Sequence, residues 1–346
     1  MKNTTQKNTT GGNMKEKNKI VIGIILSILI SGVVLFFYSF SLNKNIINSI
    51  FFSLNYEKFI VAIILVTLSF VFDGVKHFIV FRILDQKIGI FPSINSCFVT
   101  GYFSSVTPFS VGGQPFQIYY LNKKGVDSAY ATQVVLLRLF EMISLMFFID
   151  LSYIIFFSHN ITGISQNIIF LGLILTFLSS IVILLGIAFP KTIGKLLRVL
   201  KKVKILSKIV NFDKIEHWFH KLDIVIKKIF REHKWLIFID FIMMFILLIF
   251  QSYVFYYSIK IFTNINIPFF KFFSIVNIVN AVAFLVPTPG ASGSFEIIYT
   301  NVFSSFSPNK EAIIKGVLFY RFLSYYLLII FGTIILLPFA FKKDKV

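Results

Sequence analysis

The sequence predicts an all-α polytopic membrane protein with about six full transmembrane helices and two re-entrant hairpins, arranged as inverted repeats. Hydrophobic residues make up 56% of the 346-residue chain, and the mean hydropathy of +0.82 exceeds what a soluble domain can bury. Several apolar segments are long enough to cross a bilayer. Two further apolar segments are broken by proline and glycine at corresponding places in the two halves of the chain.

Six apolar segments are predicted to span the membrane, because each has the roughly 20 residues that a bilayer crossing requires. The segment after Lys19 is longer than the apolar core of a signal peptide, and no small-residue cleavage pattern follows it, so we interpret it as the first span. Residues 1–19 are polar and contain five lysines, which predicts a disordered cytoplasmic tail. The spans are residues 20–40, 59–81, 128–157, 167–189, 235–259 and 312–340.

The two broken segments, residues 93–113 and 272–306, are interpreted as re-entrant hairpins. Proline removes a backbone donor and paired glycines loosen a helix. Non-helical backbone at membrane depth persists only where protein or a water-filled cavity satisfies it. Interruptions in matching places of two halves are typical of the binding site of a transporter. The residues expected to form and gate these hairpins are Pro108, Gly112, Gly113, Gln114 and Pro115 in the first, and Pro287, Pro289, Gly290 and Gly293 in the second.

The distribution of basic residues predicts the orientation in the membrane. With the N-terminus inside, the inner segments hold 25 Lys and Arg residues and the outer loops hold 5, which follows the positive-inside rule and places both termini in the cytoplasm. The first hairpin then opens from the cytoplasm and the second from outside. Residues 20–346 therefore form one domain, in which repeat 1 (about 59–157) and repeat 2 (about 235–340) are inverted copies. This topology accounts for the net charge of +19 without a nucleic-acid partner.

Residues 190–234 join the two repeats and form the largest polar segment after the tail. Apolar residues recur at helical spacing between its lysines, which predicts one or two amphipathic helices on the inner leaflet. A positive-inside anchor without a further role is the alternative. His217 and His220 lie three residues apart but lack carboxylate or cysteine companions, and Cys97 is the single cysteine. We therefore expect no metal site, no disulfide and no cofactor.

Ionisable residues inside a bilayer are costly, so each one is a candidate site residue. Asp73 and Lys76 lie three residues apart on the second span, and Arg138 and Glu141 lie three apart on the third. This spacing places opposite charges on one helix face. Each pair either neutralises itself and locks helix packing, or lines a polar cavity that binds substrate. Three other charged residues lie near predicted span ends, where they can reach the headgroups: Asp150, Asp240 and Lys315.

Arg138 and Arg321 occupy related positions in the two repeats. Arg138 follows Gly113 by 25 residues, and Arg321 follows Gly293 by 28. A guanidinium keeps its charge and binds phosphate in a bidentate fork, so two of them facing one cavity would suit an anionic lipid headgroup. Both breaks lead into predicted helix starts, the first with Pro115 at its first helical position. Backbone N–H groups and the positive end of the helix dipole favour anions at such starts. Glu296 falls in the first turn of the second such helix, where it either compensates the dipole or serves a proton relay or a headgroup amine.

These residues carry a family resemblance. Thr107–Leu121 followed by Arg138–Glu141 resembles the first signature of the lysylphosphatidylglycerol synthase transmembrane (flippase-like) family, and Pro287–Glu296 followed by Tyr320–Tyr326 resembles the second. The resemblance covers nearly the whole chain from about residue 20. Many members place an acidic residue directly before the first arginine, where this chain has Leu137. A mechanism that needs a carboxylate there would have to use Glu141 instead.

The resemblance implies translocation of a phospholipid or lipid-linked headgroup, such as lysylphosphatidylglycerol, across the bacterial cytoplasmic membrane. In bifunctional members, a soluble synthase domain follows and transfers lysine from lysyl-tRNA to phosphatidylglycerol, and the flippase part lowers sensitivity to cationic antimicrobial peptides. We expect no synthase domain in this chain, and we infer no transfer activity from its residues. Two alternatives stay open. One is the membrane part of a phosphatidylglycerol lysyltransferase system, with aminoacyl transfer from lysyl-tRNA by this chain alone or with a separate lipid-modifying enzyme. The other is an ion-coupled transporter of a small solute. The expected partners are membrane lipids.

Overall fold

The computed structural model describes residues 55–157, 165–199, 212–283 and 288–341. These residues form helices joined by short connections, with no strand among them. The predicted tail 1–19 and the first predicted span 20–40 lie outside the described residues. The helices are α3 (Tyr56–Ile83), α4 (Ile90–Val106), α5 (Gly113–Lys123), α6 (Ser128–Phe157), α7 (Gln166–Ala188), α8 (Pro190–Val199), α10 (Phe212–Glu232), α11 (Lys234–Phe262), α12 (Phe269–Ala283), α13 (Ser294–Ser304), α14 (Lys310–Arg321), the π-helix η2 (Phe322–Tyr326) and α15 (Leu327–Phe341).

The described helices confirm an all-α membrane protein. Four stretches are long and apolar enough to cross a bilayer: α3, α7, α11 and the continuous stretch Lys310–Pro338, which runs from α14 through η2 into α15. The third predicted span forms the single 30-residue helix α6. Its apolar residues are interrupted by Arg138, Glu141 and Asp150. The π-helical turn η2 begins directly after Arg321 and is not predicted by any feature of the sequence.

The element order long helix, two short helices, long helix occurs twice, as α3–α6 (the first half) and as α11–α15 (the second half). In each half the two short helices form a hairpin whose ends meet. Asp127 N donates to Gln86 Oε1 at 3.1 Å on the two flanks of the first hairpin. The Lys271 ammonium lies 5.4 Å from the ring centroid of Phe306 at the ends of the second. The chain therefore enters and leaves each hairpin on one side.

The first hairpin differs from its predicted extent. Its second arm, α5, runs to Lys123, ten residues beyond the predicted boundary at residue 113. The sequence predicts the start of this helix but not its end, because its composition is polar. The helix packs between α4 and α6. The second hairpin, α12 with α13, agrees with the predicted 272–306 to within three residues at either end.

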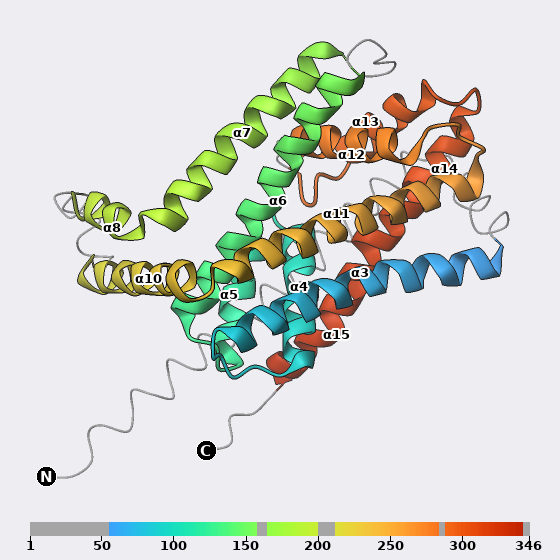
Figure 1. The fold of residues 1–346 in the computed structure, drawn as a ribbon. Coiled ribbons are helices and arrows are strands. Elements are labelled where there is room, and N and C mark those ends of the chain that lie inside the picture. Colours follow the sequence, from blue (N-terminus) through green and yellow to red (C-terminus); the bar gives the residue numbers. More distant parts are fainter. Residues whose placement is uncertain (1–54, 158–164, 200–211, 284–287, 342–346) are drawn as a thin grey trace, which may run out of the picture.

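The two hairpins open at opposite ends of the bundle, because α3 and α11 lie side by side and run antiparallel (Figure 1). Phe59, near the start of α3, and Phe262, at the end of α11, both pack against the ring of Phe319. Lys76, late in α3, pairs with Asp240, early in α11. The first hairpin flanks the C-terminal end of α3 and the second flanks that of α11. This arrangement supports the inverted-repeat relation, which itself stays a prediction.

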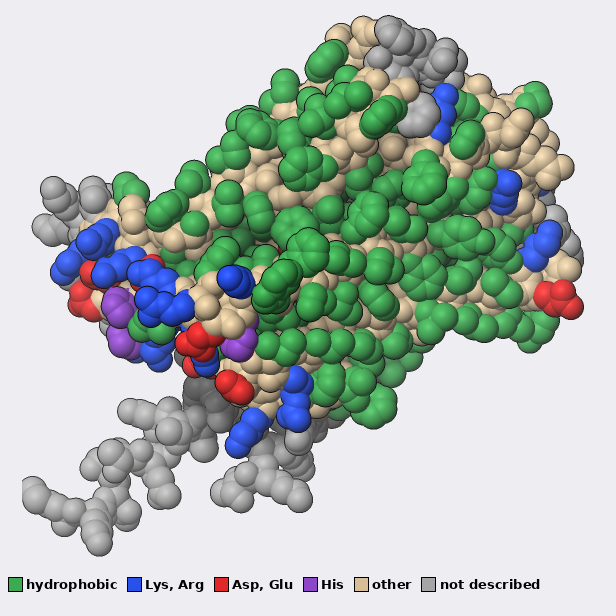
Figure 2. All heavy atoms as spheres, viewed as in Figure 1, with side chains coloured by type: hydrophobic (Ala, Val, Ile, Leu, Met, Phe, Trp, Pro, Cys, Tyr) green, Lys and Arg blue, Asp and Glu red, His purple; other side chains and the backbone are tan. Residues whose placement is uncertain are grey.

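Residues 190–234 contain two helices, α8 and α10, that pack against each other. α10 buries Leu222, Val225, Ile226 and Ile229 against the bundle, while its Lys and Arg side chains face outward. Figure 2 shows charged side chains gathered over α8 and α10 at one end of the molecule, whereas the view over the long helices is mostly hydrophobic. The amphipathic character is thus present, and contact with the inner leaflet stays a prediction.

Candidate functional site

The charged residues of the second and third spans meet across the interface between α3 and α6. Arg138 forms a bidentate ion pair with Asp73, in which Nε lies 3.1 Å from Oδ1 and Nη2 bonds Oδ2. One helical turn along, Lys76 Nζ donates to Glu141 Oε2 at 2.9 Å. Asp73, Lys76 and Glu141 are buried, while the Arg138 side chain keeps 15% exposure. These two charged residues of α3 thus lie opposite these two charged residues of α6, each beside a partner of opposite charge.

Each charge is paired across the helices and not within its own helix. The sequence predicts that Asp73 and Lys76 share one helix face and that Arg138 and Glu141 share another. The structure contains both of these faces. Packed against each other, however, the helices offer each cation a carboxylate at better geometry than its own neighbour does. The bidentate fork of Arg138 on Asp73 is the strongest such arrangement, because it makes two charge-assisted hydrogen bonds at once.

The side chains of Asp240 and Asp150 are buried inside the bundle, whereas the snorkelling considered from the sequence would require them to extend along its surface. Asp240 is buried, with Oδ1 2.9 Å from Lys76 Nζ in an ion pair that lacks the geometry of a hydrogen bond. Asp150 is fully buried, and neither of its carboxyl oxygens has a hydrogen-bond partner among the described residues. Lys315 pairs with Glu311 one turn away on α14. The antiparallel packing of α3 on α11 brings Asp240 to Lys76, which helix boundaries alone do not reveal.

Arg321 joins the second hairpin to α14. Its Nε donates to Glu296 Oε1 at 2.7 Å, and its Nη2 donates to the Gly290 carbonyl at 2.9 Å and to Ser292 Oγ at 3.0 Å. The guanidinium also lies 4.8 Å from the ring centroid of Phe295. Arg321 is buried. The residue therefore holds the break of the second hairpin in one shape.

Glu296 has two partners that explain its position in the first turn of α13. One oxygen accepts from Arg321, and the other accepts from Gly293 N at 2.7 Å, which is the glutamate half of a capping box, because Gly293 has no side chain to supply the other half. Gly293 itself has a φ of 86°, a conformation that glycine adopts without steric cost. The dipole-compensating role considered for Glu296 is thus present, together with an ion pair that the sequence did not show.

The breaks of the two hairpins touch. Pro108 of the first and Pro289 of the second form an isolated antiparallel bridge, so we call residues 107–112 and 288–293 the first and second elbow. A Cβ atom built on Gly290 would lie 3.1 Å from the Ser105 carbonyl oxygen. Three of the four non-glycine residues with positive φ among the described ones lie in the elbows: Phe109, Ser110 and Ala291. Such strained conformations persist where the surrounding structure enforces them and concentrate at functional sites.

The first elbow is organised by Thr107 and two glycines. Thr107 Oγ1 accepts from Gly112 N at 2.9 Å. Gly113 begins α5 and lies so close to α4 that a Cβ would be 2.8 Å from the Thr100 carbonyl oxygen. Pro115 is the third residue of α5, after Gln114, and not the first as expected. It still lies in the first turn, where its missing N–H costs no helical hydrogen bond. Pro287 lies outside the described residues.

The two arginines have separate surroundings. Arg138 contacts Asp73 at the α3–α6 interface, and Arg321 contacts the second elbow and α13. Among the described residues, no hydrogen bond, ion pair or ring contact joins the two arginines to a common partner. A cavity shared by the two guanidinium groups stays a prediction. Of the two, Arg138 is the more accessible, with 15% side-chain exposure against 7% for Arg321.

Asp73, His77 and Cys97 bring possible metal-ligand atoms within 4.8 Å of one another. Both oxygens of Asp73 are engaged by Arg138, and His77 Nδ1 lies 2.8 Å from the Asp73 backbone carbonyl, which accepts its hydrogen. Two of the three groups are thus committed to other partners. We assign no metal to this cluster.

The sequence profile described as "Lysylphosphatidylglycerol synthase TM region" matches residues 24–332 of this chain. The matched residues include both elbows and both arginines. No curated protein matches the sequence. The match is compatible with a membrane-embedded role in the handling of lysylphosphatidylglycerol. By this match over most of its length, the chain belongs to the lysylphosphatidylglycerol synthase transmembrane family.

Proposed function

We propose that the protein moves a phospholipid or lipid-linked headgroup, such as that of lysylphosphatidylglycerol, between the leaflets of the bacterial cytoplasmic membrane. The observation that carries the proposal is the contact between the two elbows, which reach Pro108 and Pro289 from opposite ends of the bundle. A headgroup entering from either side would meet this one constriction. Movement of either hairpin would then open the path to one side at a time.

Arg138 is the residue best placed to contact a lipid phosphate. Its two hydrogen bonds to Asp73 use Nε and Nη2 and leave Nη1 without an acceptor among the described residues. Its side chain is partly exposed. A phosphate would compete with Asp73 for the same fork of donors, which suits binding that is reversible on the time scale of transport.

The start of α5 offers a second feature that favours an anion. α5 begins at Gly113 without a side-chain cap, whereas Glu296 already closes the start of α13. Uncapped N–H groups at a helix start attract negative charge. Phe109 and Val111 of the first elbow are exposed at 48% and 63%, so this elbow lies at the surface of the bundle, where a lipid can reach it sideways.

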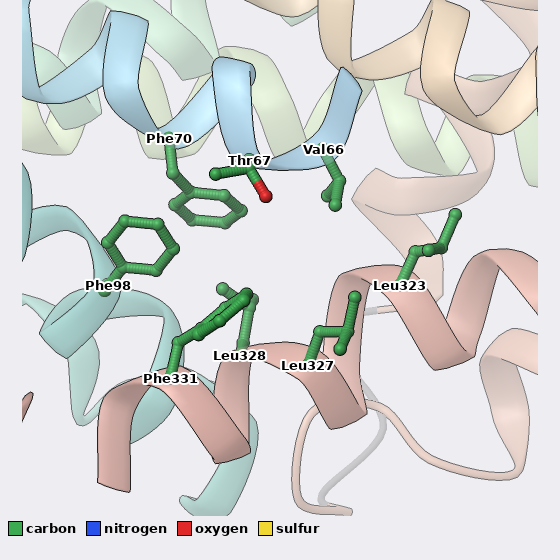
Figure 3. Close-up of a pocket in the computed structure, with 8 residues that line it drawn as sticks. All are labelled: Val66, Thr67, Phe70, Phe98, Leu323, Leu327, Leu328 and Phe331. Carbon is green, nitrogen blue, oxygen red and sulfur yellow. The ribbon is translucent and has the colours of Figure 1, made fainter. Parts of the chain in front are cut away.

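The seam between the two halves offers an apolar surface for acyl chains. A small pocket lies between α3 and α4 of the first half and η2 and α15 of the second (Figure 3). Thr67 is its one polar side chain. The residues that line it are Val66, Thr67, Phe70, Phe98, Leu323, Leu327, Leu328 and Phe331. A lipid whose headgroup moves past the elbows can keep its tails against such an apolar seam without exposing them to water.

Reconstitution tests the proposal directly. The purified protein is placed in liposomes with fluorescent phosphatidylglycerol, lysylphosphatidylglycerol or phosphatidylethanolamine in both leaflets, and a membrane-impermeant quencher measures how fast the inner pool becomes accessible. We expect faster exchange than in protein-free liposomes for at least one lipid. Arg138→Gln should slow this exchange, while Arg82→Gln, at the exposed end of α3, should not. Exchange at the protein-free rate for all three lipids would refute the proposal.

A further inference from the structure

The buried charges at the junction of α3, α6 and α11 do not balance. Three carboxyl groups, of Asp73, Glu141 and Asp240, share two fixed cations, Lys76 and Arg138. Arg138 is paired with Asp73 through both oxygens of that carboxylate. Lys76 alone faces the other two carboxyls, and each has an oxygen 2.9 Å from Nζ. With all five groups ionised, one buried negative charge would have no partner.

An unpaired buried charge is expensive, so a further positive charge must reside in the cluster. His77 is poorly placed to provide it. Its Nδ1 donates to the Asp73 carbonyl at 2.8 Å, and its buried Nε2 has no hydrogen-bond partner, so a proton there would have no acceptor. Glu141 Oε1, in contrast, is a buried carboxyl oxygen without a partner, which is free to carry a hydrogen.

Among the residues that the structure describes, no neighbouring element supplies the missing cation. α4 contributes the buried thiol Cys97, and α7 contributes Ser180, which bonds Ser144 one turn from Glu141. On α10, Asp223 is paired with Lys227. On α14, Arg321 is engaged by the second elbow and Glu296. The described part of the chain therefore leaves a proton as the counter-charge.

We propose that Glu141, Lys76 and Asp240 form a proton-binding site that holds one proton shared by the two carboxyls, and that this proton exchanges with water during lipid transport. The second part rests on the proposed function. On release, the O–H bond of one carboxyl breaks and the proton passes to water, which leaves the site with one negative charge. The groups are at most 2% exposed, so exchange requires that the packing of α3, α6 and α11 opens.

The site is built across the two halves, which gives a physical reason for coupling. Lys76 and Glu141 belong to the first half, and Asp240 belongs to the second. The carboxyls of Glu141 and Asp240 compete for one ammonium. The carboxyl that the Lys76 ammonium neutralises stays ionised, and the other carboxyl binds the proton. Movement of one half against the other changes the distance from Lys76 to Asp240, and with it the affinity of the site for the proton.

Infrared difference spectroscopy of the protein in lipid nanodiscs tests the site itself. The carbonyl stretch of a protonated carboxyl is separated from that of carboxylates, and ¹³C-labelled glutamate or aspartate identifies the residue type. The variant Asp150→Asn serves as background, because Asp150 has no cation beside it and is itself expected to be protonated. We expect one remaining protonated carboxyl at neutral pH.

Charge balance predicts how this signal responds to substitution. Glu141→Gln and Asp240→Asn should each abolish it, since Lys76 then faces a single carboxylate. Lys76→Met should double it, since two carboxyls are left without a cation. Absence of the band from the background protein, or its survival in both single-carboxyl variants, would refute the site.

Liposomes with a pH difference across the membrane test the coupling. If one proton moves with each lipid, a difference of one pH unit shifts the ratio of labelled lipid between leaflets by up to about tenfold, and Glu141→Gln removes this response. Exchange that proceeds but ignores the gradient would refute the coupling. Absence of any exchange would refute the proposed function and the coupling with it, while the infrared result stands on its own.

Discussion

Replacing Arg321 by alanine removes the cation that holds the second elbow, and the structure sets the size of the effect. Arg321 makes three hydrogen bonds, to Glu296, to the Gly290 carbonyl and to Ser292. The substitution leaves the Glu296 carboxylate, whose side chain is 8% exposed, without its cation. Loss of one partner of a buried ion pair costs about 3–5 kcal/mol. We expect a loss of unfolding free energy in this range.

A double-mutant cycle separates the ion pair from the other contacts. Glu296→Gln alone leaves the buried guanidinium of Arg321 without a carboxylate, so it should lower the free energy of unfolding by a similar amount. In the double variant Arg321→Ala, Glu296→Gln no charge remains, and mainly the neutral bonds to Gly290 and Ser292 are lost, at about 1 kcal/mol each. The two single effects sum to about 6–10 kcal/mol, whereas the double variant should cost only about 2 kcal/mol. The double variant should therefore be more stable than the sum of the single effects predicts, by about 4–8 kcal/mol.

The free energy of unfolding is measured in mild detergent by titration with sodium dodecyl sulfate, followed by tryptophan fluorescence. Arg82→Ala, an exposed cation at the end of α3, serves as the control and should change stability by less than about 0.5 kcal/mol. A cost below about 1 kcal/mol for Arg321→Ala, or strictly additive effects in the cycle, would show that the ion pair of Arg321 with Glu296 does not stabilise the second elbow.

Three further substitutions probe the fold and the proposed path. Gly113→Ala should destabilise by about 1–3 kcal/mol, because its Cβ would collide with α4, whereas Gly186→Ala on α7, with open space around it, should be neutral or stabilising in the same unfolding titration. Leu327→Trp fills the seam pocket and should slow lipid exchange in liposomes, while Leu337→Trp on the exposed side of α15 should not. Asp150→Asn should change the unfolding free energy by less than about 1 kcal/mol, because a carboxyl without a cation is held neutral; a cost of about 3–5 kcal/mol would instead reveal a hidden ion pair.

The sequence was sufficient to predict those features that depend on local chemistry. Apolar length located α3, α6, α7 and α11, and proline with glycine located both elbows. The glycine at the start of α5 and the acidic residue in the first turn of α13 follow from helix-terminus chemistry. Features of this kind need no knowledge of what packs against them.

Partners across helices could not be predicted in the same way. Spacing of three residues shows that Lys76 and Asp73 share a face, but not which helix that face meets. Lys76 therefore gains Glu141 and Asp240 only once α3, α6 and α11 are packed together. The bridge between Pro108 and Pro289 is likewise a tertiary contact, with no local signal in either elbow. Glycine and proline predicted where α5 begins but not where it ends, because apolar periodicity is weak in an element that packs on several sides.

The ion pairs fall into two kinds, and the difference predicts which of them can change during transport. Arg138 with Asp73 lies within the first half, and Arg321 with Glu296 lies within the second, so each pair can move as part of one body. The contact of Lys76 with Asp240 crosses between the halves. A rigid rearrangement of one half against the other preserves the first two pairs and must alter the third. Substitutions in the pairs internal to a half should therefore leave the response of lipid exchange to pH largely unchanged, whereas substitutions at Asp240 should remove that response. If substitutions within a half and substitutions at Asp240 change the pH response equally, the two halves do not move as rigid units.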